Sequence, residues 1–146
     1  MKQFIYFSLI VLSLFTSYAK ADEQAGAQYK VLGPWEVHYI AFPSTFIQPN
    51  IAKNYDLERS PSKGIINISV LKNSDKTAQT ATLTGTARNL LGNKKQLKFK
   101  EVVEGDAIYY LAQIDYSNEE IYRFDIEINQ NGKVQTLKFQ QKFYVD

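Results

Sequence analysis

The sequence predicts an all-β protein, an antiparallel β-sandwich of the immunoglobulin-like class, with about seven strands and one short helical segment. Two observations lead to this fold class. Apolar and polar residues alternate with a period of two over most of the chain, as expected for strands with one buried face. Clusters of Asn, Asp, Ser, Gly and Pro interrupt the alternation at short intervals, as turns do in a sandwich. A small barrel is the second architecture compatible with this pattern.

The composition is that of an ordinary globular domain. Of 146 residues, 45% are hydrophobic and 22% are charged, with 17 Lys and Arg against 15 Asp and Glu. One domain is expected at this length. The chain has no Cys and only one His and one Met, which excludes thiol catalysis, zinc–thiolate sites, iron–sulfur clusters and disulfides. We therefore expect no cofactor and no metal site.

The first 21 residues have the pattern of a secretory signal peptide. Lys2 precedes an apolar run over 4–15, and Ala19 and Ala21 supply the small residues of an A-x-A cleavage site. We expect cleavage before Asp22 and a soluble, periplasmic product without a membrane span. A retained anchor is the alternative, but crossing a bilayer takes about 20 apolar residues, and this run is shorter.

Residues 22–146 are expected to form a single sandwich domain. Loss of the signal peptide removes two lysines, which lowers the basic count from 17 to 15 and makes the formal charge zero. Non-specific nucleic-acid binding depends on a basic surplus that neutralises phosphates. Nucleic acid is therefore not an expected partner.

The pattern along the chain starts with a loose polar segment over 22–28 and a first strand over 35–43. Helical spacing occurs only after this strand, where Ile47, Ile51 and Tyr55 recur four residues apart. The proline between the first two can occupy the first helical turn, where its missing N–H costs nothing. We expect one short helix there.

The other strands follow from the same alternation, and Asn131-Gly132 predicts a type I′ hairpin turn before the last of them. Their expected ranges are 65–71, 80–88, 96–103, 107–116, 122–128 and 134–145.

Charge is unevenly distributed along the chain. Basic residues dominate 88–100, and acidic residues dominate 101–127. We expect neighbouring strands to pair outward Lys and Glu side chains across the sheet, each pair contributing a few tenths of a kcal/mol, on the order of 0.3. A basic face that meets an acidic partner is the alternative.

Several segments are similar to one family. They are Tyr55 with Arg59-Ser60, and the stretches 37–39, 42–44, 89–92, 104–110 and 139–146. Through them the sequence resembles an uncharacterised family of Gram-negative periplasmic proteins, domain of unknown function 4426. The resemblance implies a signal peptide and a periplasmic β-rich domain. It implies no activity and no catalytic residues.

Candidate site residues cluster near one turn. Glu104 and Asp106 flank it, and Tyr109 and Tyr110 follow. Paired carboxylates beside tyrosines can serve glycoside hydrolysis or bind calcium, but no calcium loop motif is present. We expect Asp106 to accept backbone N–H groups of the turn. Contact with a polar ligand or a partner is the functional alternative.

Three further residues complete the candidate binding set. His38 is the only histidine, so any imidazole chemistry depends on it, although a structural hydrogen bond is the simpler role. Arg59 and Asn89 occupy turn-like segments, where binding groups are often placed.

The sequence favours a non-enzymatic protein-interaction or accessory module. Its partner would be an unidentified periplasmic protein that binds an exposed sheet face or edge. The alternative is a small-molecule or glycan-binding module that uses the 104–110 turn region with Arg59 and His38. An enzyme is the weakest interpretation, because no catalytic motif is present.

Overall fold

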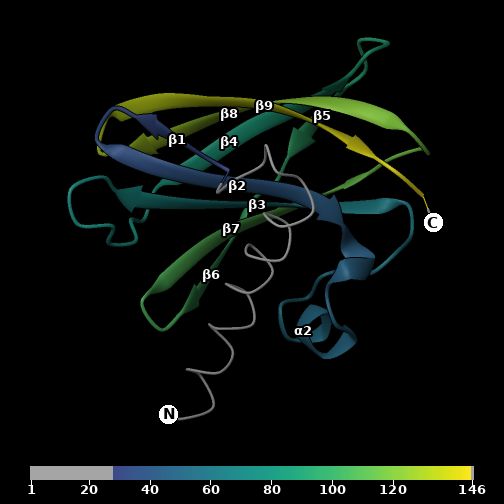
Figure 1. Ribbon diagram of the computed structural model, residues 1–146, viewed down its shortest axis with the longest axis horizontal. Coiled ribbons are helices and arrows are strands. Elements are labelled where there is room, and N and C mark those ends of the chain that lie inside the picture. Colours follow the sequence, from purple (N-terminus) through teal and green to yellow (C-terminus); the bar gives the residue numbers. More distant parts are fainter. Residues whose placement is uncertain (1–27, 146) are drawn as a thin grey trace.

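The computed structural model describes residues 28–145, which form two antiparallel sheets packed face to face (Figure 1). The predicted signal peptide and its cleavage site lie outside these residues. The five-stranded sheet has the order β1-β2-β3-β7-β6. Its strands are β1 (Tyr29–Leu32), β2 (Trp35–Pro43), β3 (Lys63–Lys72), β6 (Lys100–Glu104) and β7 (Ala107–Asp115).

The four-stranded sheet has the order β5-β4-β8-β9. Its strands are β4 (Thr82–Asn89), β5 (Lys94–Leu97), β8 (Glu120–Gln130) and β9 (Lys133–Phe143). In the lettering of immunoglobulin-like domains, β2 to β9 take the places of strands A, B, C, C′, D, E, F and G. The sheets then reproduce the orders A-B-E-D and C′-C-F-G, with β1 added at one edge. The predicted sandwich is confirmed, and the barrel alternative is wrong.

The number of strands differs from the expected seven. A short strand, β1, pairs with β2, which the alternation did not indicate. The expected strand over 96–103 is two strands, because the chain leaves the four-stranded sheet after Leu97 and enters the five-stranded sheet at Lys100. The alternation breaks at this crossing, where Lys100 and Glu101 are both polar and Val102 and Val103 are both apolar, but the expected strand ran across this short break.

The main core lies between the sheets. Trp35, at 2% exposure, and Phe124, also at 2%, are among its largest members. Phe124 stacks on Phe139 with ring centroids 4.7 Å apart, and Phe139 in turn lies 4.6 Å from Tyr39 of the opposite sheet. Aromatic contacts therefore join the two layers.

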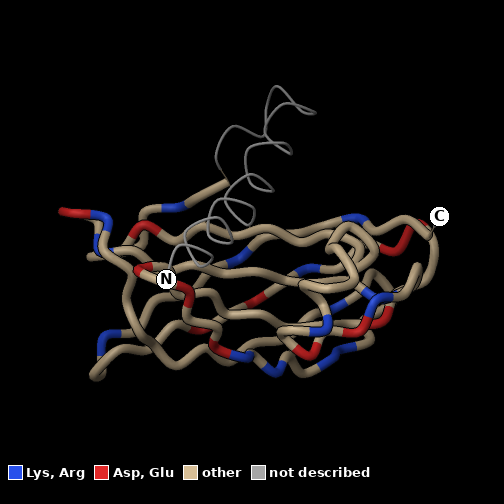
Figure 2. Tube along the Cα trace, turned by 90° about the horizontal axis from the view of Figure 1, so that it is seen from below, with Lys and Arg blue, Asp and Glu red and all other residues tan. Residues whose placement is uncertain are grey.

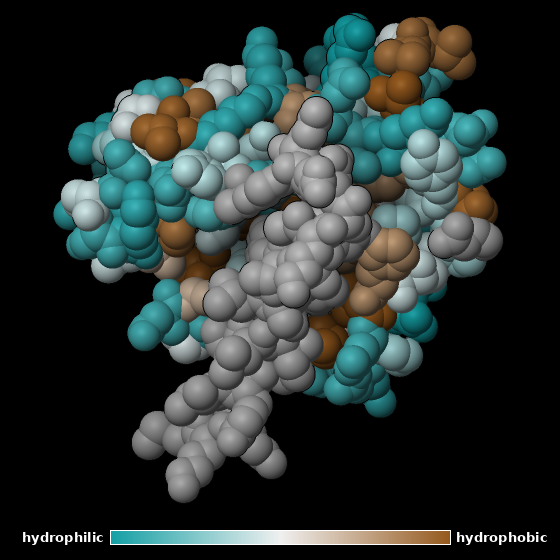
Figure 3. Space-filling model, in the orientation of Figure 1, coloured by the Kyte–Doolittle hydropathy of each residue, from teal (hydrophilic) through white to brown (hydrophobic). Residues whose placement is uncertain are grey.

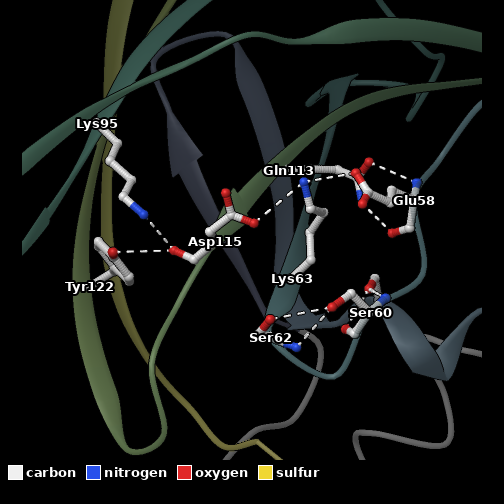
Figure 4. Close-up of polar contacts among 9 residues, drawn as sticks. Glu58, Ser60, Ser62, Lys63, Lys95, Gln113, Asp115 and Tyr122 are labelled. Carbon is white, nitrogen blue, oxygen red and sulfur yellow. Dashed lines mark hydrogen bonds and ion pairs between the residues drawn. The ribbon is translucent and has the colours of Figure 1, made fainter.

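A tyrosine fixes the corner between β7 and β8. The Tyr122 hydroxyl donates to the Asp115 carbonyl at 3.3 Å, and Lys95 Nζ donates to the same carbonyl at 2.7 Å (Figure 4). A tyrosine at the start of strand F that bonds back upstream is a recurring feature of this fold. Burial is the largest cause that raises the pKa of Tyr122, to about 12, and the Glu120 carboxylate adds to it.

A second apolar cluster covers the outer face of the five-stranded sheet. The 3-10 turn η1 (Ser44–Phe46) and the helix α2 (Pro49–Asn54) place Ile47 and Ile51 against Ile40, Phe42 and Ile65. This is the predicted short helix, and its proline does occupy the first helical turn. The cluster buries part of a sheet face that would otherwise meet solvent.

The last hairpin turn has the predicted geometry. Asn131 and Gly132 have φ of 51° and 83°, the two positive values that a type I′ turn requires.

Basic and acidic residues occur on both layers of the sandwich (Figure 2). Cross-strand pairing of opposite charges occurs at Lys138 and Asp125, 3.8 Å apart. It also occurs at Lys63 and Asp115 of β3 and β7, 3.3 Å apart. The expectation fails at Arg88, which lies opposite Lys94 on one side and Arg123 on the other.

Candidate functional site

The β6–β7 hairpin divides its candidate residues between two faces of the sheet. Glu104 shares the outer face with Val102, since they are two residues apart on one strand, and Tyr109 lies on this face too. Tyr110 points into the core between the sheets. Asp106 is exposed in the turn.

Glu104 is a buried carboxyl whose loss of water is not offset by hydrogen bonds at Oε2. It is 6% exposed, and its Oε2 atom has no hydrogen-bond partner. Burial raises the pKa of this carboxyl, because the charged form loses water without gaining a donor. Buried polar atoms in folded proteins are almost always hydrogen-bonded, so an exception calls for an explanation.

Tyr109 lies beside this carboxyl. It is 6% exposed, and both burial and the nearby charge of Glu104 raise its pKa. None of the hydrogen bonds among residues 28–145 uses its hydroxyl. The outer face of the hairpin thus combines an unpaired carboxyl oxygen with a phenol.

Asn67 adds a second unpaired oxygen to the same face. It lies opposite Ile40 and Leu111, both members of the outer cluster, and it is 5% exposed. Its Oδ1 atom has no partner. By register, Tyr109 lies between Asn67 and Glu104. Asn67 is not among the residues expected from the sequence, although an amide within an otherwise apolar strand is a visible signal.

Tyr110 and Asp106 belong elsewhere. The Tyr110 hydroxyl accepts the backbone N–H of Ala81 at 2.8 Å and donates to Glu101 Oε2 at 3.2 Å, which gives it a structural role. Asp106 makes none of the hydrogen bonds found in the described part of the chain. Its expected function as an acceptor for the turn backbone is therefore wrong.

His38 lies on the same outer face but on β2. Its Nε2 is 3.1 Å from Glu36 Oε2, and its ring centroid is 5.2 Å from that of Tyr29. Glu36 also pairs with Lys76 at 3.4 Å. The hydrogen bond with His38 is the largest cause that lowers the pKa of Glu36. The imidazole thus has a structural partner and is not brought together with Glu104.

Arg59 holds the segment that covers the outer cluster. Its Nε donates to the Ile47 carbonyl at 2.7 Å, and Nη2 donates to the Thr45 carbonyl at 3.1 Å. The neighbouring Glu58 exchanges two backbone bonds with the Gln113 side chain, at 3.0 and 2.8 Å (Figure 4). The contacts of Arg59 are those of a structural residue.

Asn89 organises the turn between β4 and β5, in the other sheet. Its Oδ1 accepts the backbone N–H groups of Leu91 and Asn93 at 3.1 and 2.8 Å. Its Nδ2 donates to Glu120 Oε2 at 3.1 Å. Every polar atom of this buried side chain is used within the protein.

Strand β6 is an edge of the five-stranded sheet. A two-residue turn joins it to β7, so Glu104 and Ala107 form the hydrogen-bonded closing pair of the hairpin. Antiparallel ladders alternate, which directs the backbone N–H and C=O groups of Val103 and Glu101 away from β7. Val103 is 60% exposed. The free backbone edge therefore adjoins the unpaired carboxyl of Glu104.

A family model described as domain of unknown function (DUF4426) matches residues 29–146. The chain belongs to this family. The crystal structure of a DUF4426 protein from Pseudomonas aeruginosa is 36% identical and superposes with a TM-score of 0.71, covering 82% of this chain and 95% of that one. No curated protein matches the sequence.

The DUF4426 fold is also similar to that of FetP from uropathogenic Escherichia coli. A copper-bound variant of FetP is 12% identical with a TM-score of 0.57, covering 80% of this chain and 94% of that one. FetP as isolated is 13% identical with a TM-score of 0.52, and the match covers 80% of this chain and 91% of that one. At this identity the likeness concerns the fold alone.

Residues 28–145 contain no group of three His, Cys, Asp or Glu side chains placed to hold a metal ion. The helix within the same range is too short to cross a bilayer.

Proposed function

We propose that this DUF4426 protein is a non-enzymatic binding module of the periplasm that receives an extended segment of a partner protein along β6. The observation that carries the proposal is the unpaired, buried Glu104 oxygen at the end of an open strand edge. Periplasmic export is supported by the signal-peptide pattern at the start of the chain.

The β6 edge offers both parts of a strand-recognition site. The outward backbone groups of Glu101 and Val103 can continue the sheet by hydrogen bonding to an added strand. The unpaired oxygen of Glu104 then accepts a hydrogen bond from a side chain of that strand. Both unpaired atoms on this face are oxygens, so the partner is expected to present donors, such as Lys, Arg, Ser or an amide.

Another long edge is less open. Strand β9 has eleven residues, but β1 approaches its outer side, where Lys30 Nζ donates to the Lys138 carbonyl. Its exposed lysines, Lys138 and Lys142, are the kind of residue that discourages strand addition. These features favour β6 as the receiving edge.

Copper binding is not carried over from FetP. His38 has one carboxylate neighbour, Glu36, which already pairs with Lys76. The contacts of His38 with Glu36 are therefore taken as structural.

A proline at position 103 tests the proposal. Because the Val103 N–H points away from β7, Val103→Pro removes an outward donor without breaking the β6–β7 ladder. Val103→Ala is the matched control, since it changes the side chain and keeps the donor. We expect both variants to melt within a few degrees of the wild type. Periplasmic proteins retained by the wild type and by Val103→Ala should be lost from Val103→Pro.

A small-molecule or glycan ligand is the second candidate, and Asn67 favours it because this unpaired oxygen lies inward from the edge. Glu104→Gln and Val103→Pro separate the two. If only Glu104→Gln weakens binding, the ligand uses the face and not the backbone edge. If both retain binding, neither proposal for this site stands.

A further inference from the structure

The tip of the β4–β5 hairpin presents two leucines to solvent. Leu90 is 62% exposed and Leu91 is 88% exposed, the highest value among the exposed large hydrophobic residues in the described range. The hairpin projects from the upper right of the sandwich in Figure 1, and hydrophobic surface projects at the same place in Figure 3. Exposed pairs of this kind mark binding surfaces more often than isolated apolar residues do.

The protein holds these leucines outward by a dedicated set of hydrogen bonds. The backbone N–H of Asn89 bonds to the Asn93 carbonyl at 3.0 Å, and that of Gly92 bonds to the Asn89 carbonyl at 3.1 Å. Gly92 has φ of 87°, a value that suits glycine. Together with the hydrogen bonds that the Asn89 side chain accepts from Leu91 and Asn93, these bonds fix the backbone conformation of the loop. Because the tip is ordered before binding, little conformational entropy remains to be lost there.

The base of the tip is a row of unpaired cations. Lys94, Arg88 and Arg123 lie opposite one another on three adjacent strands. None of them takes part in an ion pair within residues 28–145. Like charges in direct cross-strand contact destabilise a sheet, so this row opposes folding.

Nearby acidic groups are engaged by other partners. Glu120 accepts hydrogen bonds from the Asn89 side chain and from the Ser117 backbone. Glu119 pairs with Lys142 at 3.9 Å, and Asp125, two residues from Arg123 on the same face of β8, pairs with Lys138 at 3.8 Å. The positive charge of the row is therefore left for an external partner.

We propose that the β4–β5 tip docks on an anionic phospholipid bilayer. In this arrangement Leu90 and Leu91 enter between the headgroups, and the row of Arg88, Lys94 and Arg123 contacts the lipid phosphates. The apolar area is convex and only two side chains wide, which is too small for the core of a stable protein interface and suited to insertion into a soft surface. An apolar anchor combined with a basic patch gives reversible membrane attachment.

This surface is separate from the β6 edge, so the two proposals fail independently. The direct test uses the exported protein, purified as the host secretes it, and co-flotation with vesicles of 70% phosphatidylcholine and 30% phosphatidylglycerol. We expect binding to these vesicles to be at least about tenfold stronger than to pure phosphatidylcholine. Raising the salt from about 0.1 to about 0.5 M should remove most of it.

Variants assign the contacts. Leu90→Ser with Leu91→Ser should lower vesicle binding about tenfold or more, and so should Arg88→Gln with Lys94→Gln and Arg123→Gln. A matched charge control neutralises three exposed lysines remote from the tip and should change binding less than about twofold. The control lysines are Lys53, Lys72 and Lys133.

A tryptophan at the tip reports insertion. Leu91→Trp should shift its emission to shorter wavelength when anionic vesicles are added, and brominated lipid should quench it. The proposal is overturned if the wild type does not bind anionic vesicles, or if the variant with both leucines changed to serine binds them as well as the wild type does. It is also overturned if neutralising the three control lysines reduces vesicle binding as much as neutralising the three cations at the tip. Capture of an acidic protein by the tip without any vesicle binding would also overturn it.

Discussion

The β4–β5 and β6–β7 hairpins each bury one polar side chain, but only the first of these side chains has all its hydrogen bonds made within the protein. Asn89 satisfies three hydrogen bonds within the protein, two to backbone N–H groups and one to Glu120. Glu104 is at least as buried, yet one of its carboxyl oxygens has no partner.

The difference is between a buried polar group whose hydrogen bonds are made within the fold and one that the fold leaves unpaired. A satisfied buried amide stabilises the loop that it organises, so the exposed tip around it can carry the binding role. A buried carboxylate without hydrogen bonds destabilises the fold, and its free oxygen can accept a hydrogen bond from a bound partner. Substitution should therefore move the free energy of unfolding in opposite directions at the two sites.

The largest effect is expected for Asn89→Ala. It leaves two backbone N–H groups and Glu120 without their partner, and the free energy of unfolding should fall by about 2 to 3 kcal/mol in urea titrations. Asn93→Ala is the control, because this exposed side chain lies in the same loop. A loss below about 0.5 kcal/mol for Asn89→Ala would contradict the structural role.

The next effect concerns Tyr122, which lies opposite Asn89 in the register and supports the same end of the sandwich. Tyr122→Phe removes the bond to Asp115 and should cost about 1 kcal/mol. The pKa of Tyr122 is raised to about 12 from its ordinary value of 10.0. Its stabilisation is therefore complete below pH 10 and is lost as the pH rises through about 12.

The pH profile of unfolding checks this sign. The difference in stability between the wild type and Tyr122→Phe should shrink as the pH rises from 10 to 12. Tyr144→Phe is the matched control, since Tyr144 is 51% exposed. A difference that stays constant across this range would show that Tyr122 does not carry the effect.

Glu104→Gln should have the opposite sign. It removes the charge of a buried carboxylate and should raise the free energy of unfolding by about 1 kcal/mol at pH 7. Because folding raises the pKa of Glu104, the wild type is most stable below the ordinary value of 4.5 and loses stability as the pH rises through the folded value. The gain should therefore vanish near pH 4.

Chemical denaturation of this variant at pH 4 and pH 7 measures that gain, and the exposed Glu127→Gln serves as control. Destabilisation by Glu104→Gln at pH 7 would mean that the carboxylate is already satisfied.

The smallest effect is expected for Asp106→Ala. Its side chain is exposed and joins none of the hydrogen bonds of the described residues, so the change in stability should stay within about 0.5 kcal/mol. A loss of about 1 kcal/mol or more in thermal melts would restore the turn-acceptor role that the sequence suggested.

The architecture could be predicted because strand alternation records which face is buried. Tyr109 and Tyr110 are neighbours on one strand, so alternation puts them on opposite faces, as the structure has them. Alternation did not show where 94–104 passes between sheets, since the break in alternation over 100–103 is too short to distinguish the end of one strand from an irregularity within it. Nor could it place β1, whose side chains are almost all exposed.

The site was less predictable, because residue type and loop position do not show whether a polar group finds a partner in the fold. Arg59 and Asn89 are polar residues in turn-like segments, and the side chains of both form hydrogen bonds with groups of the protein itself. The burial of Glu104 and Asn67 without partners depends on tertiary packing.

The passage of 94–104 between the two sheets has a mechanical consequence. This segment starts at the tip of the β4–β5 hairpin and ends at the tip of the β6–β7 hairpin. The two tips lie at opposite ends of the molecule (Figure 1). An extended chain rises about 3.3 Å per residue, so the segment spans on the order of 30 Å. If both tips are occupied, the domain acts as a rigid spacer that holds the captured segment at a fixed height above the lipid surface.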